Sequence, residues 1–161
     1  MKYEHIIWDW NGTLVNDAQL CIEIVNQILA DYEIMPVDSN FYLDNFSFPV
    51  SQYYNLLGLP SSGSEYEEIS QRFIHEYRKN HHNCKLQENC FKVLGYLQER
   101  RISQSVLSAG NISDVLDFVK YHKLSDFFTV ISGVSHANAT GKSEIAFEHL
   151  NKVETSPHKT L

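Results

Sequence analysis

The order of apolar and polar positions divides the chain into two kinds of segment. Short apolar runs lie at 5–8, 104–107 and 127–131. Such runs are typical of strands buried on both faces of a parallel sheet. Helical spacing of apolar residues follows the later two runs, over 111–121 and 143–150. Strands that alternate with helices predict right-handed crossovers and a parallel sheet.

A long helical stretch separates the first apolar run from the rest of this pattern. Its periodicity predicts helices over 17–32, 50–57 and 64–79, with an ambiguous segment at 39–45. No convincing strand interrupts these segments. The stretch therefore predicts a small helical bundle that is inserted into the sheet-forming chain.

Local residues predict where the inserted helices begin. Asp17 can cap the first helix with its carboxylate, and Pro49 suits the first helical position of the third. Ser64 and Glu67 have the spacing of a capping box, which predicts the start of the fourth. The helices are therefore expected to have well-defined N-termini.

The fold predicted from these elements is α/β, with a Rossmann-like parallel sheet core and an inserted α-helical segment. The core would comprise residues 1–15 and 83–161, and it includes an amphipathic helix over 87–100. The helical insert would comprise residues 16–82. A chain of 161 residues is long enough for such a core with one modest insertion.

Composition and charge narrow the class of protein. The chain is 43% hydrophobic and 20% charged, as in ordinary globular proteins. A net charge of -7 argues against a nucleic-acid partner, because phosphate contacts need clustered Lys and Arg. No run has membrane-spanning length, and no signal-type segment opens the chain. The 3 cysteines lack metal-type spacing and fit reduced thiols, so we expect a cytoplasmic protein without a membrane partner.

The residues that carry chemistry lie where the predicted strands end. Asp9 ends the first strand, and the turn dipeptide Asn11-Gly12 follows it. Open α/β sheets bind ligands beyond the carboxyl ends of their strands, so Asp9 is expected at the rim of a cleft. Ser108 ends the second strand, before a glycine-containing turn at a helix N-terminus. Its hydroxyl and the backbone N–H groups of such a turn suit a phosphate.

Lys142 follows the third predicted strand and opens a helix, where a cation is unfavourable to the helix dipole. A lysine placed against that preference is expected to face a negative charge, such as Asp9 with a phosphoryl group. The alternative interpretation is an exposed loop lysine.

Together these residues resemble the haloacid dehalogenase superfamily. The segment DWNGTL at 9–14 is similar to its first motif, D-x-D-G-T-L, and Ser108 and Lys142 match its second and third motifs. The resemblance is to the phosphoglycolate-phosphatase-like branch with a helical cap, and it implies a Mg²⁺-dependent phosphatase. It implies that Asp9 is the nucleophile, that Asn11 and Lys142 act with it in catalysis, and that Asp9 and Asn11 bind the metal. The residues that it implies for substrate binding are Trp10, Ser108, Ala109, Gly110 and Lys142.

The chain departs from this family pattern in two places. The second Asp of the first motif, which is the general acid/base in the family, is Asn11 here, and an amide cannot transfer a proton at neutral pH. The fourth motif, an acidic pair on one more strand, is missing from the 161 residues. We therefore expect either a fragment of a longer protein or a naturally short and catalytically weak chain.

The expected function is hydrolysis of a small phosphorylated metabolite through an aspartyl-phosphate intermediate. The alternative is a weakly active or inactive phosphate-binding or regulatory domain. Within the predicted insert, residues 16–78 contain two arginines (Arg72 and Arg78), no lysine and ten acidic residues. Such an insert is a poor clamp for a second strongly anionic group. The specific substrate and the oligomeric state stay open.

Overall fold

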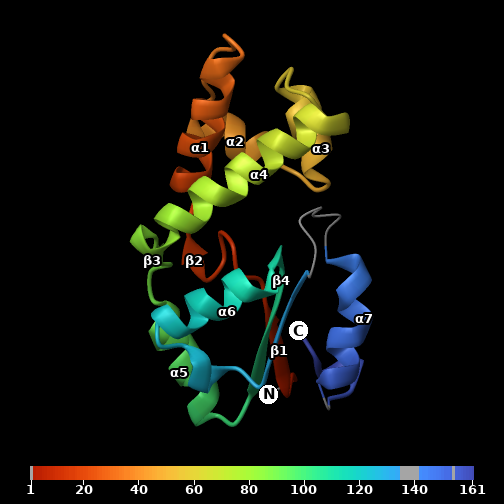
Figure 1. Cartoon of the computed structure of the whole chain (residues 1–161). Coiled ribbons are helices and arrows are strands. Elements are labelled where there is room, and N and C mark those ends of the chain that lie inside the picture. Colours follow the sequence, from red (N-terminus) through yellow and green to blue (C-terminus); the bar gives the residue numbers. More distant parts are fainter. Residues whose placement is uncertain (1, 135–141, 154) are drawn as a thin grey trace. The chain divides into compact units, whose positions relative to one another are not determined.

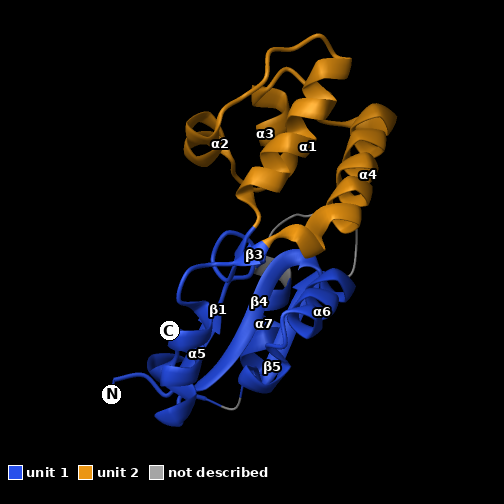
Figure 2. Cartoon of the chain, turned by 90° about the vertical axis from the view of Figure 1, so that its left-hand side faces the viewer, with its two compact units in different colours: residues 1–16, 85–136, 142–161 blue, residues 17–84, 137–141 orange. Residues whose placement is uncertain are grey.

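The chain forms two compact units, which Figure 2 shows in different colours. The computed structural model describes residues 2–134, 142–153 and 155–161. The core unit holds the chain up to Asn16, the segment that resumes at Lys85 and the C-terminal segment from Lys142. The cap unit holds Asp17–Cys84.

The core unit is built on a three-stranded parallel sheet. The strands β1 (His5–Trp8), β4 (Ser103–Asn111) and β5 (Val130–Val134) lie in the order β1-β4-β5. β4 pairs in parallel with both neighbours, so all three strands end at the same edge of the sheet. The parallel α/β fold predicted from the sequence is confirmed.

Helices cover both faces of this sheet (Figure 1). α5 (Cys90–Glu99) and α6 (Ile112–Tyr121) lie on one face, and α7 (Ser143–Lys152) lies on the other. The side chains that fill the core unit are fully buried apolar groups, which are expected to supply most of its stability. Those with exposed fractions of 1% or less are Trp10, Val15, Leu94, Val106, Phe118, Val119 and Leu124.

A chain of buried polar side chains joins α7 to all three strands. His5 Nε2 lies 2.7 Å from Ser105 Oγ, and the same oxygen lies 2.8 Å from His149 Nε2. On its other side, His149 Nδ1 lies 2.8 Å from Ser132 Oγ. Burial lowers the pKa of both His5 and His149, and the charges of His5 and Lys152 lower that of His149 further. This histidine–serine chain therefore favours neutral imidazoles in the folded protein.

The C-terminal residues lie along the edge of β1 that faces away from β4. The Leu161 N–H donates to His5 O at 3.0 Å, and the Ile7 N–H donates to Leu161 O at 2.7 Å. Thr160 also forms a parallel bridge with His5. A short 3₁₀ turn, Pro157–Lys159, precedes these contacts.

Two short strands flank the cap unit in the sequence. β2 (Val15–Asn16) and β3 (Lys85–Leu86) pair antiparallel, with Val15 opposite Leu86 and Asn16 opposite Lys85. The sequence pattern did not predict this ladder, because two residues are too few to show a period.

The cap unit is helical. It contains α1 (Ala18–Asp31), α2 (Ser39–Asn45), α3 (Val50–Leu56), α4 (Gly63–Asn80) and the 3₁₀ turn His81–Asn83. Apolar and aromatic side chains from all four helices form one buried cluster. Its most buried members are Ile24, Val25, Ile28, Leu29, Tyr53 and Tyr54. In the described residues of both units, no helix is long and apolar enough to cross a membrane.

The helix starts predicted in the cap unit agree with the structure within one residue, but the capping contacts predicted for them differ. The Asp17 side chain makes no capping bond; its Oδ2 accepts a hydrogen bond of 2.6 Å from Tyr77 OH, 60 residues away. α3 begins at Val50 with Pro49 as its N-cap, and α4 begins at Gly63, before the proposed capping box. The Asp17 carboxylate that was predicted to cap α1 is thus bound by a distant residue instead.

The third predicted strand was also displaced. Residues 125–127 form a 3₁₀ turn, and β5 begins only at Val130 and runs to Val134. β4 is longer than predicted and extends to Asn111, past the candidate Ser108.

Candidate active site

A tight turn holds Asp9 directly after β1. The backbone N–H of Trp10 donates to Asp9 Oδ1 at 2.7 Å. Trp10 O accepts hydrogen bonds from the N–H groups of Leu14 at 2.9 Å and Val15 at 3.1 Å. Gly12, with φ +73°, takes the left-handed conformation that this turn requires and that other residues adopt at a cost. The Asp9 carboxylate is therefore fixed by its own turn.

Lys142 forms an ion pair with Asp9. Its Nζ lies 2.6 Å from Asp9 Oδ1, and the two side chains are 33% and 41% exposed, respectively. Both contacts of Asp9 fall on Oδ1. In the part of the chain that the structure describes, Oδ2 has no hydrogen bond or ion pair. One carboxylate oxygen is thus held in place, while the other faces no competing donor among the described residues. Gly141, which precedes Lys142, lies outside the described residues.

Ser108 lies in β4, three residues before the strand ends at Asn111, and its side chain contacts the turn that follows Asp9. Its side chain is fully buried, and its Oγ accepts the Gly110 N–H at 2.9 Å. The Ser108 hydroxyl also lies 3.4 Å from Asn11 Oδ1, to which it donates. The second and first predicted motifs therefore meet through a side-chain contact between β4 and the turn that follows β1.

The turn after Ser108 leads into the N-terminus of α6. Asn111 is the N-cap, and its Oδ1 accepts the Ser113 N–H at 2.9 Å. Helix N-termini carry partial positive charge, and together with Lys142 this makes the end of β4 suitable for an anion.

The remaining predicted substrate-binding residues have different environments. The Trp10 side chain is fully buried and packs against Phe118, with ring centroids 5.9 Å apart. Ala109 is 6% exposed. Any contribution of Trp10, Ala109 and Gly110 to the site would therefore come from their backbone, and their contact with a substrate stays a prediction.

Gln87 supports the Asp9 turn and was not identified from the sequence. Its Nε2 donates to Gly12 O at 2.9 Å, and its backbone N–H donates to Leu14 O at 2.9 Å. Gln87 follows β3, so the turn is held from a segment 75 residues away in the sequence. No local pattern marks such a contact.

The oxygen donors of the site suit a hard divalent cation. Mg²⁺ binds one or two carboxylates, keeps several waters and takes the rest of its ligands from substrate phosphates. Asp9 Oδ2 is an anionic oxygen without a partner in the described segments, and the oxygens of Asn11 follow two residues later. These donors fit the Mg²⁺ predicted from the sequence.

Comparison with known proteins agrees with the fold. The sequence matches the family model of haloacid dehalogenase-like hydrolases over residues 6–161. It finds no match among curated protein sequences.

Similar solved structures include a predicted phosphoglycolate phosphatase from Haemophilus somnus, with a TM-score of 0.78 and 18% identity, over 99% of this chain and 76% of that one. A haloacid dehalogenase-like protein from Streptococcus pneumoniae has a TM-score of 0.80 and 19% identity, over 99% and 74% of the two chains. For a predicted phosphatase from Clostridium acetobutylicum the values are 0.80 and 14%, over 100% and 75%. At such identities these structures show a shared fold.

The family model spans nearly the whole chain, including the Asp9 turn, the end of β4 and Lys142. The resemblance drawn from the three motifs is therefore confirmed. The chain belongs to the family of haloacid dehalogenase-like hydrolases.

Proposed function

We propose that this protein is a Mg²⁺-dependent phosphatase that hydrolyses a small phosphomonoester through a phosphoryl group carried on Asp9. The observation that carries the proposal is that the two oxygens of the Asp9 carboxylate have different contacts. Oδ1 is held by Lys142 at 2.6 Å and by the Trp10 N–H at 2.7 Å, whereas Oδ2 has no such contact in the described part of the chain. A nucleophile needs this combination of fixed orientation and an available lone pair.

The reaction has two displacements at phosphorus. Asp9 Oδ2 attacks the phosphorus atom, the bond to the ester oxygen breaks, and the alcohol leaves with a proton taken from solvent or a nearby acid. Water then attacks the acyl phosphate, which releases inorganic phosphate and regenerates the Asp9 carboxylate. Mg²⁺, when bound by Asp9 and Asn11, would neutralise charge on the phosphoryl oxygens.

The chain's own donors would hold the phosphoryl oxygens in both steps. Phosphoryl transfer depends mainly on positioning and on charge neutralisation. Lys142 supplies a cation beside Asp9, and the turn after Ser108 leads into the N-terminus of α6, whose partial positive charge favours an anion. Their role is to orient the phosphorus in line with Oδ2.

Asn11 supports a second candidate function, a phosphate-binding domain with little turnover. An amide at this position has no transferable proton, and general acid/base assistance is typically worth about 10²–10⁴ in rate. Asn11 Oδ1 instead accepts the Ser108 hydroxyl at 3.4 Å, which ties it to the phosphate-binding side of the site.

The charges of the cap unit favour a substrate with a single phosphate as its only strongly anionic group. Arg72 already forms an ion pair with Asp31 inside the cap unit. That arginine would have to leave its partner before it could bind a carboxylate such as that of phosphoglycolate. We therefore place the substrate among small phosphorylated metabolites without a second such group.

The test is release of inorganic phosphate from a panel of phosphomonoesters, with Mg²⁺ and with EDTA. The wild type is expected to show Mg²⁺-dependent turnover, and Asp9→Asn is expected to abolish it, because an amide is not a competent nucleophile. Acid quenching during turnover should trap protein-bound phosphate in the wild type alone. Turnover that persists in D9N would refute the proposal. Phosphate binding without turnover in the wild type would establish the second candidate instead.

A further inference from the structure

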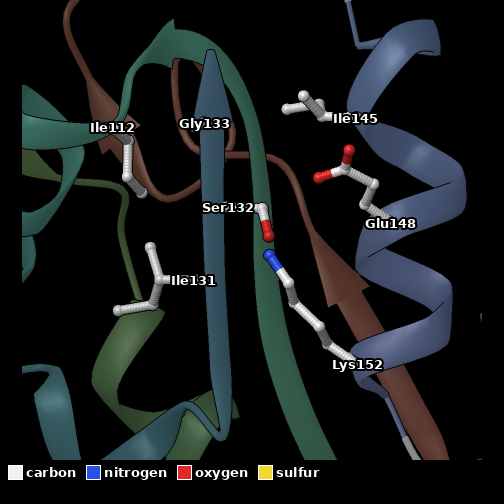
Figure 3. A pocket seen from close by; sticks show the side chains of 7 residues that line it. All are labelled: Ile112, Ile131, Ser132, Gly133, Ile145, Glu148 and Lys152. Atoms are coloured by element: carbon white, nitrogen blue, oxygen red, sulfur yellow. The ribbon is translucent and has the colours of Figure 1, made fainter. Parts of the chain in front are cut away.

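Gly133 is the penultimate residue of β5 and lies beside the last residues of β4. It lines a cavity of about 100 Å³. In Figure 3 the side chains of Ile112 and Ile131 lie on one side of its strand and that of Ser132 on the other. Because side chains alternate along a strand, Gly133 shares the face of Ile131, toward α6. Any side chain at 133 would therefore point toward the start of α6.

No room exists for such a side chain. A Cβ atom built on Gly133 would lie 2.7 Å from Gly110 O, 2.9 Å from Ile112 Cα and 3.0 Å from Ile112 N. All three are backbone atoms, which cannot swing away as a flexible side chain can. For comparison, a Cβ built on Gly95 in α5 would meet no atom within 4 Å. The backbones of β5 and of the turn after Ser108 thus touch because residue 133 is glycine.

The strand register explains the close approach. Leu107 is opposite Ser132, but Asn111 is opposite Val134. The segment Ser108–Gly110 is therefore a bulge in β4 that lies opposite Gly133 alone. A bulge bends its strand and re-aims the groups that it carries. Here it carries Ser108 Oγ, the Gly110 N–H that this oxygen accepts at 2.9 Å, and the approach to α6.

We infer that Gly133 is a positioning residue for the phosphate-binding turn at Ser108–Asn111. Because residue 133 has no side chain, the backbone of the bulge can contact the backbone of β5. The bulge in turn positions the Ser108 hydroxyl and the N–H groups of the turn relative to Asp9. The identity of the ligand, a phosphoryl group, rests on the proposed function. The effect of Gly133 on the position of the turn can be tested without any ligand.

The experiment compares Gly133→Ala with Gly95→Ala in the full chain. Backbone amide NMR shifts of residues 108–112 are measured without ligand, and inorganic phosphate is then titrated with Mg²⁺ present. In G133A we expect the amides of residues 108–112 to move before phosphate is added. The phosphate affinity should then fall about tenfold or more, since one hydrogen bond to a charged group contributes that much. G95A should leave both measurements unchanged.

Each result decides a different question. Unchanged 108–112 amides in G133A would overturn the inference, whatever the affinity. If the wild type binds no phosphate, the proposed function fails, and the ligand-free amide shifts still decide whether Gly133 sets the turn. If G133A does not fold, the close approach is tested in the wild-type protein. The Gly133 Hα protons should then give strong NOEs to the Ile112 amide, and the absence of these NOEs would overturn the inference.

Discussion

Replacing Lys142 with methionine separates the contribution of this cation to stability from its contribution to chemistry. The ion pair with Asp9 is short, at 2.6 Å, but its side chains are 33% and 41% exposed. Ion pairs exposed to this degree typically contribute about 0.2–1 kcal/mol, because water and salt screen them. Methionine keeps most of the apolar stem. The free energy of unfolding of K142M should therefore fall by about 1 kcal/mol or less.

The chemical effect should be much larger. In the proposed reaction a phosphoryl group joins Asp9, so Lys142 would face negative charge on two groups, and the charge on the phosphoryl oxygens would change during each step. Loss of one preorganised donor to such charge typically costs about 10²–10³ in rate, or about 2.7–4 kcal/mol. We therefore expect kcat/KM of K142M to fall by about 10²-fold or more.

The assay combines urea unfolding with kinetics on the phosphomonoester that the wild type hydrolyses fastest. The dissociation constant of inorganic phosphate gives a third measurement. Lys159→Met is the matched control, since Lys159 Nζ lies 2.5 Å from Glu4 Oε1 with side chains 53% and 58% exposed. K159M should lose as little stability as K142M and keep its activity. An unchanged kcat/KM in K142M, or a stability loss that accounts for the whole loss of activity, would refute the reasoning.

Two further predictions concern Asn11 and the buried histidines. Asn11→Asp restores a proton donor without changing the size of the side chain. Turnover should rise most for alkyl phosphates, by about 10²-fold or more, and least for p-nitrophenyl phosphate, whose leaving group departs as a stable anion. The ratio of the two rates in wild type and N11D is the measurement, and equal changes would show that protonation of the leaving group is not what Asn11 withholds. For His5 and His149 the folded pKa lies below the unfolded value of about 6.5, so the unfolded chain takes up protons first as the pH falls. The free energy of unfolding should therefore decline as the pH falls below about 6.5. Urea unfolding of His149→Gln should show a weaker decline than that of the wild type. Equal pH profiles of the two proteins would show that His149 does not cause the decline.

The elements with a clear period could be predicted from the sequence, and those fixed by distant contacts could not. The apolar run at 5–8 and the helical spacing at 111–121 correspond to β1 and α6 within one residue. The Asp17 carboxylate, in contrast, is bound by Tyr77 OH rather than by its own helix. That contact outweighs the local capping preference of Asp17, and the sequence near Asp17 does not predict it.

The candidate site shows the same division. Asp9 and Ser108 could be placed together because parallel strands end at one edge of a sheet, and the structure has Ser108 Oγ within 3.4 Å of Asn11 Oδ1. The support from Gln87 and the fit of Gly133 against Gly110 could not be foreseen. Both contacts join segments that are far apart in the sequence. The local sequence around a glycine in a strand does not show whether another backbone segment approaches it closely.

The β2–β3 ladder has a consequence for how the gene can change. Val15 lies opposite Leu86 and Asn16 opposite Lys85, so the cap unit is topologically the connection of a two-stranded hairpin, 68 residues long from 17 to 84. The entropy of closing a flexible connection grows only with the logarithm of its length, by about 0.6 kcal/mol for each doubling. Insertions and deletions between Asn16 and Lys85 therefore cost the core unit little stability. The hairpin is a position at which recombination can exchange one folded module for another without redesigning the core unit.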